Sequence, residues 1–277
     1  MLQSSARCDV AKIHSKQPWF VLNSASDFSL MSSNNRAISH YYSFEASESA
    51  DVTVAIPDGC VDILFDCNES EPSAMVYGTT LEARHTRFCY SHRYFGVRFA
   101  PGVIPGLLQL AADELIEQSH NFLEVAADVS AIFEQIVSQP EFARQVALFD
   151  NFIARDCVRE SSALTTQIIQ EICRQKGNIR IKDLEALTGY TTRTLQTRFR
   201  NDTGLSPKLF SRLIRCQSAV YDINQQGQVV FSDLAATLGY SDQSHFLREF
   251  KKLVSTTPVD YQNRVRQSTY LGRIRYL

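Results

Sequence analysis

The sequence predicts an α+β protein in two parts. The N-terminal part is expected to be a β-barrel with a helical subdomain, and the C-terminal part an all-α domain in which a long helix joins two helix-turn-helix motifs. Short runs of β-branched and aromatic residues occupy the first hundred positions, helical periodicity begins after Pro101, and one helical pattern occurs twice near the end. A chain of 277 residues can hold two domains, which we expect over residues 1–158 and 159–277.

Six short apolar runs are expected to form the strands of the N-terminal domain. They are WFVLNS, ISHYYSFEA, DVTVAIP, VDILFD, SAMVYGT and YFGVRFA. Clusters of turn-forming residues such as SSNNR and NESEPS separate them. Many short strands without intervening helices favour a small barrel or a sandwich.

Helical spacing follows these strands. The expected helical segments are PGVIPGLLQLAADEL, SAIFEQIVSQ and EFARQVALFDNFIARD. The third has its apolar residues on one helical face, at Phe142, Val146, Phe149 and Ile153. We therefore expect a helical subdomain that ends near Val158.

From Ser161 onward the sequence is expected to be helical almost throughout. The helical segments are SSALTTQIIQEICRQKG, IKDLEALTG, TTRTLQTRFRNDTG, SPKLFSRLIRCQSAVYDINQQG, FSDLAATLG, SDQSHFLREFKKL and TPVDYQNRV. Ser206-Pro207 and Thr257-Pro258 are strong helix starts, because in each a hydroxyl cap precedes a proline at the first helical position.

Part of this helical region is a duplication. Residues 181–189 match 231–239 at an offset of 50, and after one extra turn residue, 195–210 match 246–261 at an offset of 51. Each copy has the pattern of a helix, a tight turn with glycine, and a second helix. The repeat therefore predicts two helix-turn-helix units.

The second helix of each unit has an apolar face and an outward face. The apolar face is formed by Leu195 and Phe199 in one copy and by Phe246 and Phe250 in the other. The outward residues are Arg193, Gln196, Thr197 and Arg200, then Gln243, Ser244, Leu247, Arg248 and Lys251. Arginine can recognise guanine, glutamine adenine, and an apolar group the thymine methyl. One such face could simply be solvated, but two copies with varied outward residues favour nucleic-acid binding.

Charge and length agree with this interpretation. Residues 180–277 contain 15 Lys+Arg and 8 Asp+Glu, whereas the preceding residues are net acidic and the whole chain has a formal charge of -2. The helical pattern from Ser206 to Gln225 would span roughly 30 Å at ~1.5 Å per residue. That length is close to the separation of about 34 Å between successive major grooves on one face of DNA.

These C-terminal residues resemble the DNA-binding domain of AraC/XylS-type transcriptional regulators. GYSDQSHFLREFKKLVSTTPVDYQ is similar to the family signature, and LEALTGYTTRTLQTRFRNDTGLSPKLF to its first helix-turn-helix. The likeness covers about residues 162–266. It implies a bacterial, sequence-specific regulator that is not an enzyme and that binds double-stranded DNA, with RNA polymerase as a further partner if it activates transcription.

The resemblance also implies roles for the outward residues. Base contacts would come from Arg193, Gln196, Thr197, Gln243, Ser244, Leu247 and Arg248. Leu247 departs from the family, in which a hydrogen-bonding side chain is common at that position. Phosphate contacts, which position the protein without specifying sequence, would come from Arg200, Lys251 and Lys252.

The N-terminal half resembles, less specifically, the sensor domain of some regulators in this family. PDGCVDILFD and YFGVRFAPG carry the likeness. It implies a β-barrel, cupin-like domain that binds a small-molecule effector or forms a homodimer. Candidate effector contacts are Asp58, Asp62 and Tyr42, although the aspartates could equally be turn residues at a strand start and the tyrosine part of a strand core.

No cofactor or metal ion is expected. Cys60, Cys67, His85, Cys89 and His92 fall within a short stretch, with His85, Cys89 and His92 as the nearest set. The closely paired cysteines that are typical of zinc sites are absent, so buried or otherwise satisfied side chains are favoured, with a reactive thiol as an alternative. The seven cysteines are expected to be reduced thiols.

We expect a cytoplasmic protein, because no run approaches eighteen apolar residues and the first residues lack the apolar core of a signal peptide. Motifs of serine hydrolases, phosphate-binding loops and zinc proteases are also absent from the sequence. Two alternatives remain open. The chain could be a ligand-binding or interaction protein in which DNA binding is secondary, or the barrel could contain a catalytic pocket.

Overall fold

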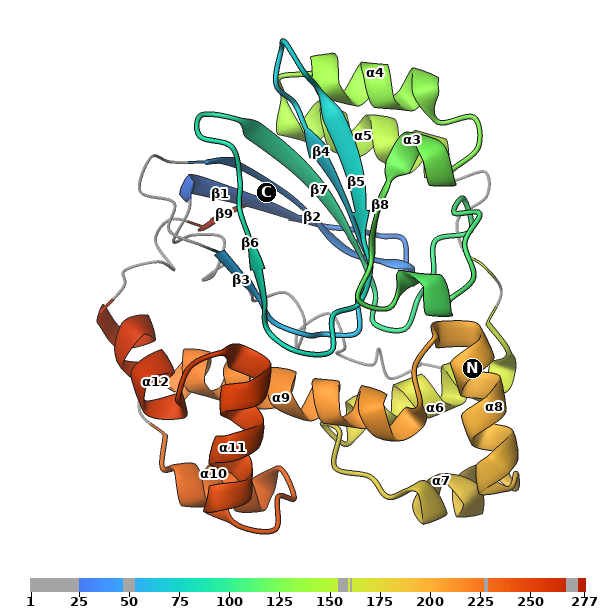
Figure 1. Cartoon of the computed structure of the whole chain (residues 1–277), viewed down its shortest axis with the longest axis vertical. Helices are drawn as coiled ribbons and strands as arrows, with labels where there is room; N and C mark the ends of the chain where they lie inside the picture. Colours follow the sequence, from blue (N-terminus) through green and yellow to red (C-terminus); the bar gives the residue numbers. More distant parts are fainter. Residues whose placement is uncertain (1–24, 47–52, 154–158, 160, 227–228, 268–273) are drawn as a thin grey trace, which may run out of the picture.

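The computed structural model describes residues 25–46, 53–153, 159, 161–226, 229–267 and 274–277. The expected strand WFVLNS lies outside these ranges, as do most of the residues around the expected domain boundary near Val158. The described chain has a sheet-rich half followed by a helical half, joined in the order that the sequence predicts (Figure 1).

A seven-stranded sheet forms the centre of the N-terminal half, in the order β8-β5-β4-β7-β2-β1-β9. The strands are β1 (Ala25–Ser32), β2 (Ile38–Ala46), β4 (Asp62–Asp66), β5 (Ser73–Tyr77), β7 (Arg93–Phe99), β8 (Ser119–Asn121) and β9 (Ile274–Tyr276). All neighbours are antiparallel except β1 and β9, which are parallel. In the described part of the chain β8 and β9 do not pair with each other, so the main sheet is open there.

A separate two-stranded ribbon lies between the main sheet and the helical half (Figure 1). It pairs β3 (Thr53–Ala55) with β6 (Arg84–Thr86) in antiparallel orientation. The strand predicted from DVTVAIP is therefore present, but it belongs to this ribbon and not to the main sheet. The two sheets leave a space between them that is described below.

Helices cover one face of the main sheet. They are α3 (Phe122–Val125), α4 (Ser130–Ser138) and α5 (Phe142–Ile153), as the sequence predicts for the last two (Figure 1). Alternation along the strands turns Phe65 and Phe95 toward these helices, where Phe65 meets Phe149 edge-on with ring centroids 6.3 Å apart. This buried layer is the core of the N-terminal half.

The prediction of a helix over PGVIPGLLQLAADEL is wrong, because most of this segment is not helical. Only a short 3₁₀ helix, η1 (Asp113–Leu115), forms in this segment. Two of its backbone N–H groups bond to distant segments instead. Gly102 donates to the Gly59 carbonyl at 2.7 Å, and Gln109 donates to the Val125 carbonyl at 2.7 Å. Gly102 also has a positive φ of 73°, which an α-helix does not allow.

The C-terminal half contains seven helices among the described residues. They are α6 (Ala163–Arg174), α7 (Ile181–Thr188), α8 (Thr192–Thr203), α9 (Pro207–Gln226), α10 (Phe231–Thr237), α11 (Gln243–Val254) and α12 (Pro258–Gln267). Helix α9 runs across the domain, with α7 and α8 near one end and α10 and α11 near the other (Figure 1). The expected long connector and the two flanking helix-turn-helix units are therefore confirmed.

One buried apolar cluster joins the two halves. It includes Phe28 and Phe44 on the inner face of the sheet and Phe199, Phe210 and Phe246 from the helices. The last helical segment expected from the sequence ends at Val265, and the sequence analysis did not identify the strand that follows. Strand β9 returns to the sheet, where the Leu277 N–H donates to the Leu30 carbonyl at 3.0 Å.

We predict that Phe199→Ala lowers the free energy of unfolding by about 3–5 kcal/mol, because it leaves a cavity at a fully buried position of α8. Gln196→Ala, three residues earlier on the exposed face, should change it by less than about 0.5 kcal/mol. Chemical denaturation followed by circular dichroism measures both. Equal effects of the two substitutions would contradict the assigned orientation of α8.

Candidate functional site

Helix α8 presents a continuous polar surface. Arg193, Gln196, Thr197 and Arg200 are all exposed. The helix is fixed to α7 by Glu185, whose carboxylate accepts from the Thr192 hydroxyl at 2.6 Å and also from the Thr192 backbone N–H. The outward residues of the first unit therefore project from a helix with a defined start.

Helix α11 presents the corresponding surface of the second unit. Gln243, Ser244, Arg248 and Lys251 are exposed. Its start is capped by Asp242, which accepts from the His245 N–H at 2.7 Å, and this bond holds the pKa of Asp242 below its ordinary value. An ion pair between Glu249 and Arg212 fastens α11 to α9.

Two residues of α11 have further contacts that the sequence did not suggest. Leu247 is half-buried and packs against the apolar core, which leaves less of it available to a thymine methyl. Lys252 Nζ lies 2.8 Å from a carboxylate oxygen of Glu82, in the N-terminal half. A phosphate contact by Lys252 would compete with this ion pair.

A cavity of about 440 Å³ lies on the inner face of the main sheet. Phe28, Tyr42 and Leu64 of the main sheet line it on one side, and Val54 and His85 of the β3–β6 ribbon on another. The three predicted effector residues, Asp58, Asp62 and Tyr42, are all among its lining residues. The structure thus brings together side chains from three separate segments.

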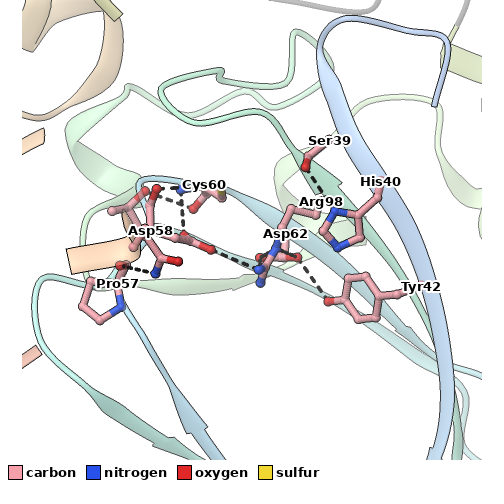
Figure 2. A network of polar contacts seen from close by, with 10 residues as sticks. Ser39, His40, Tyr42, Pro57, Asp58, Cys60, Asp62 and Arg98 are labelled. Carbon is pink, nitrogen blue, oxygen red and sulfur yellow. Dashed lines mark hydrogen bonds and ion pairs between the residues drawn. The ribbon is translucent and has the colours of Figure 1, made fainter. Parts of the chain in front are cut away.

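Arg98 is the centre of this group, and the sequence analysis missed it. Its Nη1 lies 3.0 Å from Asp58 Oδ2, while Nε and Nη2 each lie 2.9 Å from an oxygen of Asp62 (Figure 2). The Tyr42 hydroxyl donates to Asp62 Oδ1 at 3.1 Å. The sequence YFGVRFA could have revealed this role of Arg98. In a strand, Arg98 faces the opposite side of the sheet from its neighbours Val97 and Phe99.

The electrostatics of the cavity depend on burial. Burial raises the pKa of the Asp58 carboxyl, and Arg98 only partly opposes this. Burial alone would lower the pKa of Arg98, but Asp62 and Asp58 outweigh it and hold that pKa well above its ordinary value. The guanidinium therefore stays charged.

Asp58 also has the turn role that the sequence left open. Its Oδ1 accepts from the Cys60 backbone N–H at 2.9 Å, so one oxygen shapes the turn and the other binds Arg98 (Figure 2). Burial, with help from Asp58, raises the pKa of the Cys60 thiol well above its ordinary value. A reactive thiolate at Cys60 is therefore disfavoured.

The turn that carries Asp58 touches the helical half directly. Gly59 has φ of 77°, and a Cβ built there would lie 2.9 Å from the ring of Phe210 on α9. Gln217, also on α9, donates from Nε2 to the Pro57 carbonyl at 2.9 Å. One wall of the cavity is thus also a contact surface for the helix that separates the two helix-turn-helix units.

The comparison with protein families supports the assignment of helix-turn-helix units to the helical half. Residues 184–264 match the family model of a helix-turn-helix domain, and residues 35–121 match that of a domain of unknown function (DUF6597). The chain carries an AraC-type helix-turn-helix domain. The matched range of this AraC-type domain runs from within α7 to within α12.

Two curated relatives are each similar to part of this chain. RhaR of Enterobacter sp. (strain 638), an HTH-type transcriptional activator, is 24% identical over 136 residues, which are 49% of this chain and 43% of RhaR. An uncharacterised HTH-type transcriptional regulator of Haemophilus influenzae is 26% identical over 106 residues, 38% of this chain and 35% of that protein. The chain spans less than half the length of these relatives.

Among solved structures, ToxT from Vibrio cholerae is similar over 82% of this chain and 98% of its own, with 11% identity and a TM-score of 0.45. None of the helices in the described ranges is long and apolar enough to cross a membrane.

We predict that Arg98→Met lowers the free energy of unfolding by about 3–5 kcal/mol at neutral pH, because it leaves two buried carboxylates without a counter-charge. The loss should shrink as the pH falls toward the ordinary aspartate value of 3.8, since a carboxyl with a raised pKa destabilises the fold only when it is ionised. Urea denaturation at several pH values measures this.

The matched control is Arg84→Met, at an exposed arginine that also lines the cavity. It should change the free energy of unfolding by less than about 0.5 kcal/mol at every pH. A pH-independent loss for Arg98→Met would show that its charge is not what stabilises the two aspartates.

Proposed function

We propose that this protein is a sequence-specific, DNA-binding transcription regulator whose activity depends on a small molecule bound in the N-terminal cavity. The observation that carries the proposal is the duplicated exposed face of α8 and α11, set at the two ends of α9 within an AraC-type domain. Two such helices can enter successive major grooves on one side of a duplex. The relatives named as transcriptional regulators support the same role.

The proposed contacts divide into two kinds. Arg193, Gln196, Thr197, Gln243, Ser244 and Arg248 read base edges, with Leu247 limited to its exposed part, and Arg200, Lys251 and Lys252 bind phosphates. Double-stranded DNA is the main partner, and RNA polymerase is a second if the protein activates transcription. In this proposal, residues 1–158 form the effector-binding or dimerising domain and residues 159–277 form the DNA-binding domain. The protein acts in the cytoplasm.

Regulation would act through the shared wall of the cavity. The turn at residues 57–60 holds Asp58 on its cavity side and contacts Phe210 and Gln217 of α9 on the other. A ligand that draws Arg98 or Asp58 into new bonds would alter how this turn supports α9. The effector would thereby shift an equilibrium between DNA-competent and incompetent arrangements.

Selection of bound duplexes from a random DNA pool tests the proposal most directly. The expected result is one enriched sequence with two recognition elements about one helical turn apart. Binding that is equal for all sequences would favour the alternative of a ligand-binding protein in which DNA contact is secondary. Thermal-shift screening of small molecules then tests the cavity.

We predict that Arg193→Ala or Arg248→Ala weakens binding to the selected DNA by about 1–3 kcal/mol and relaxes specificity at one position. Arg200→Ala should instead weaken binding to all sequences alike and reduce the magnitude of the salt slope by about 1. Titrations against selected and random duplexes at several salt concentrations separate the two classes. Equal losses on both duplexes for Arg193→Ala would contradict its base-reading role.

We predict that Glu82→Gln strengthens DNA binding up to a few-fold, because it releases Lys252 from an ion pair worth about 0–1 kcal/mol. The control is Glu71→Gln, which removes the same charge from an exposed residue of the same half that takes no part in the described ion pairs. Binding titrations compare the two variants. If both strengthen binding equally, the effect is one of net charge and the Lys252 contact has no role.

A further inference from the structure

Three potential metal ligands of different chemistry converge at one end of strand β4. The ligand atoms of Asp66, Cys89 and His92 all lie within 4.8 Å of one another. His92 Nδ1 is 2.7 Å from Asp66 Oδ2. His85, which the sequence grouped with Cys89 and His92, is not part of this cluster and lines the cavity instead.

The fold places these three residues by strand register and a tight turn. Asp66 is the last residue of β4 and pairs with Tyr94 of β7. Cys89 and His92 lie in the turn just before β7, where the His92 N–H donates to the Cys89 carbonyl at 3.3 Å. Ser91 between them has φ of 60°, and this left-handed residue brings Cys89 and His92 to the same side.

The buried side chain of Tyr94 lies next to this cluster. The Tyr94 hydroxyl accepts from the Cys89 backbone N–H at 2.9 Å. Tyr94 is only 5% exposed, so its position is fixed by packing against Phe44 and Phe88. This contact fixes the Cys89 backbone, and an ion held by both His92 and Asp66 would replace the hydrogen bond between these two side chains.

We propose that Asp66, Cys89 and His92 form a binding site for a divalent transition-metal ion, with Zn²⁺ as the best match. A thiolate, an imidazole and a carboxylate are the three ligand types that Zn²⁺ combines in proteins. Three protein ligands leave a fourth position for water. Cys89 is exposed while Asp66 and His92 are half-buried, so an ion has access from solvent.

The site has a consequence for the neighbouring cavity. The same turn carries Arg87 and Phe88, and both line the cavity. Phe88 packs against Phe44 with ring centroids 4.9 Å apart. A metal ion bound at Cys89 and His92 would fix this turn and with it one wall of the cavity. The metal site itself does not depend on the DNA-binding role proposed above.

Titration of the reduced full-length protein with Co²⁺ tests the proposal, because Co²⁺ replaces Zn²⁺ and its thiolate bond gives an absorption band of its own. The expected result is a thiolate-to-cobalt band that Zn²⁺ abolishes by displacement. Cys89→Ser should remove the band, and Asp66→Asn or His92→Ala should weaken Co²⁺ binding by more than about tenfold, since even outer partners of metal sites contribute that much.

The controls identify the ligands. His85→Ala should retain the band and the affinity, and so should the substitution to serine of Cys8 or Cys157, which lie outside the described residues. Circular dichroism checks that each variant folds, and the exposed position of Cys89 makes its replacement by serine mild. A band that persists in Cys89→Ser, a band lost in His85→Ala, or no band in the wild-type protein would each overturn the proposal.

Discussion

The two-pronged ion pair of Arg98 is the interaction on which much of the molecule depends. One guanidinium joins strand β7 to Asp62 of β4 and to Asp58 of the turn at residues 57–60. That turn in turn supports α9 through Phe210 and Gln217. A buried charge group thus lies between the cavity and the helix that separates the two helix-turn-helix units. Removal of any one of these partners would leave a buried charge without compensation.

The sequence predicted correctly those features that depend on residues close together in the chain. Leu195 and Phe199, and their counterparts Phe246 and Phe250, were placed correctly because helical periodicity is determined within one or two turns. The helix expected after Pro101 failed because Gly102 and Gln109 find their hydrogen-bond partners at Gly59 and Val125, far away in sequence. Strand β9 has three residues and no pattern of its own, so only its pairing with β1 identifies it.

The candidate sites show the same limit. Asp58, Asp62 and Tyr42 could be named from their residue types, whereas their partner Arg98 depends on a strand register that pairs it with Asp62. Likewise Cys89 and His92 were visible as neighbours, but their third member, Asp66, is set by the pairing of β4 with β7. The base-reading roles stay predictions, since position on a helix says where a side chain points and not which base it meets.

Strand β9 gives the architecture an unusual constraint. The helical half leaves the sheet half near residue 159 and, beyond α12, rejoins it when Ile274 is buried beside β1. The helical half is therefore joined to the sheet half at both of its ends along the chain. Because the two halves also share a buried apolar cluster, any motion between them requires both that cluster and the pairing of β9 with β1 to open. A three-residue strand thus couples the position of α12 and the second helix-turn-helix unit to the edge of the sheet.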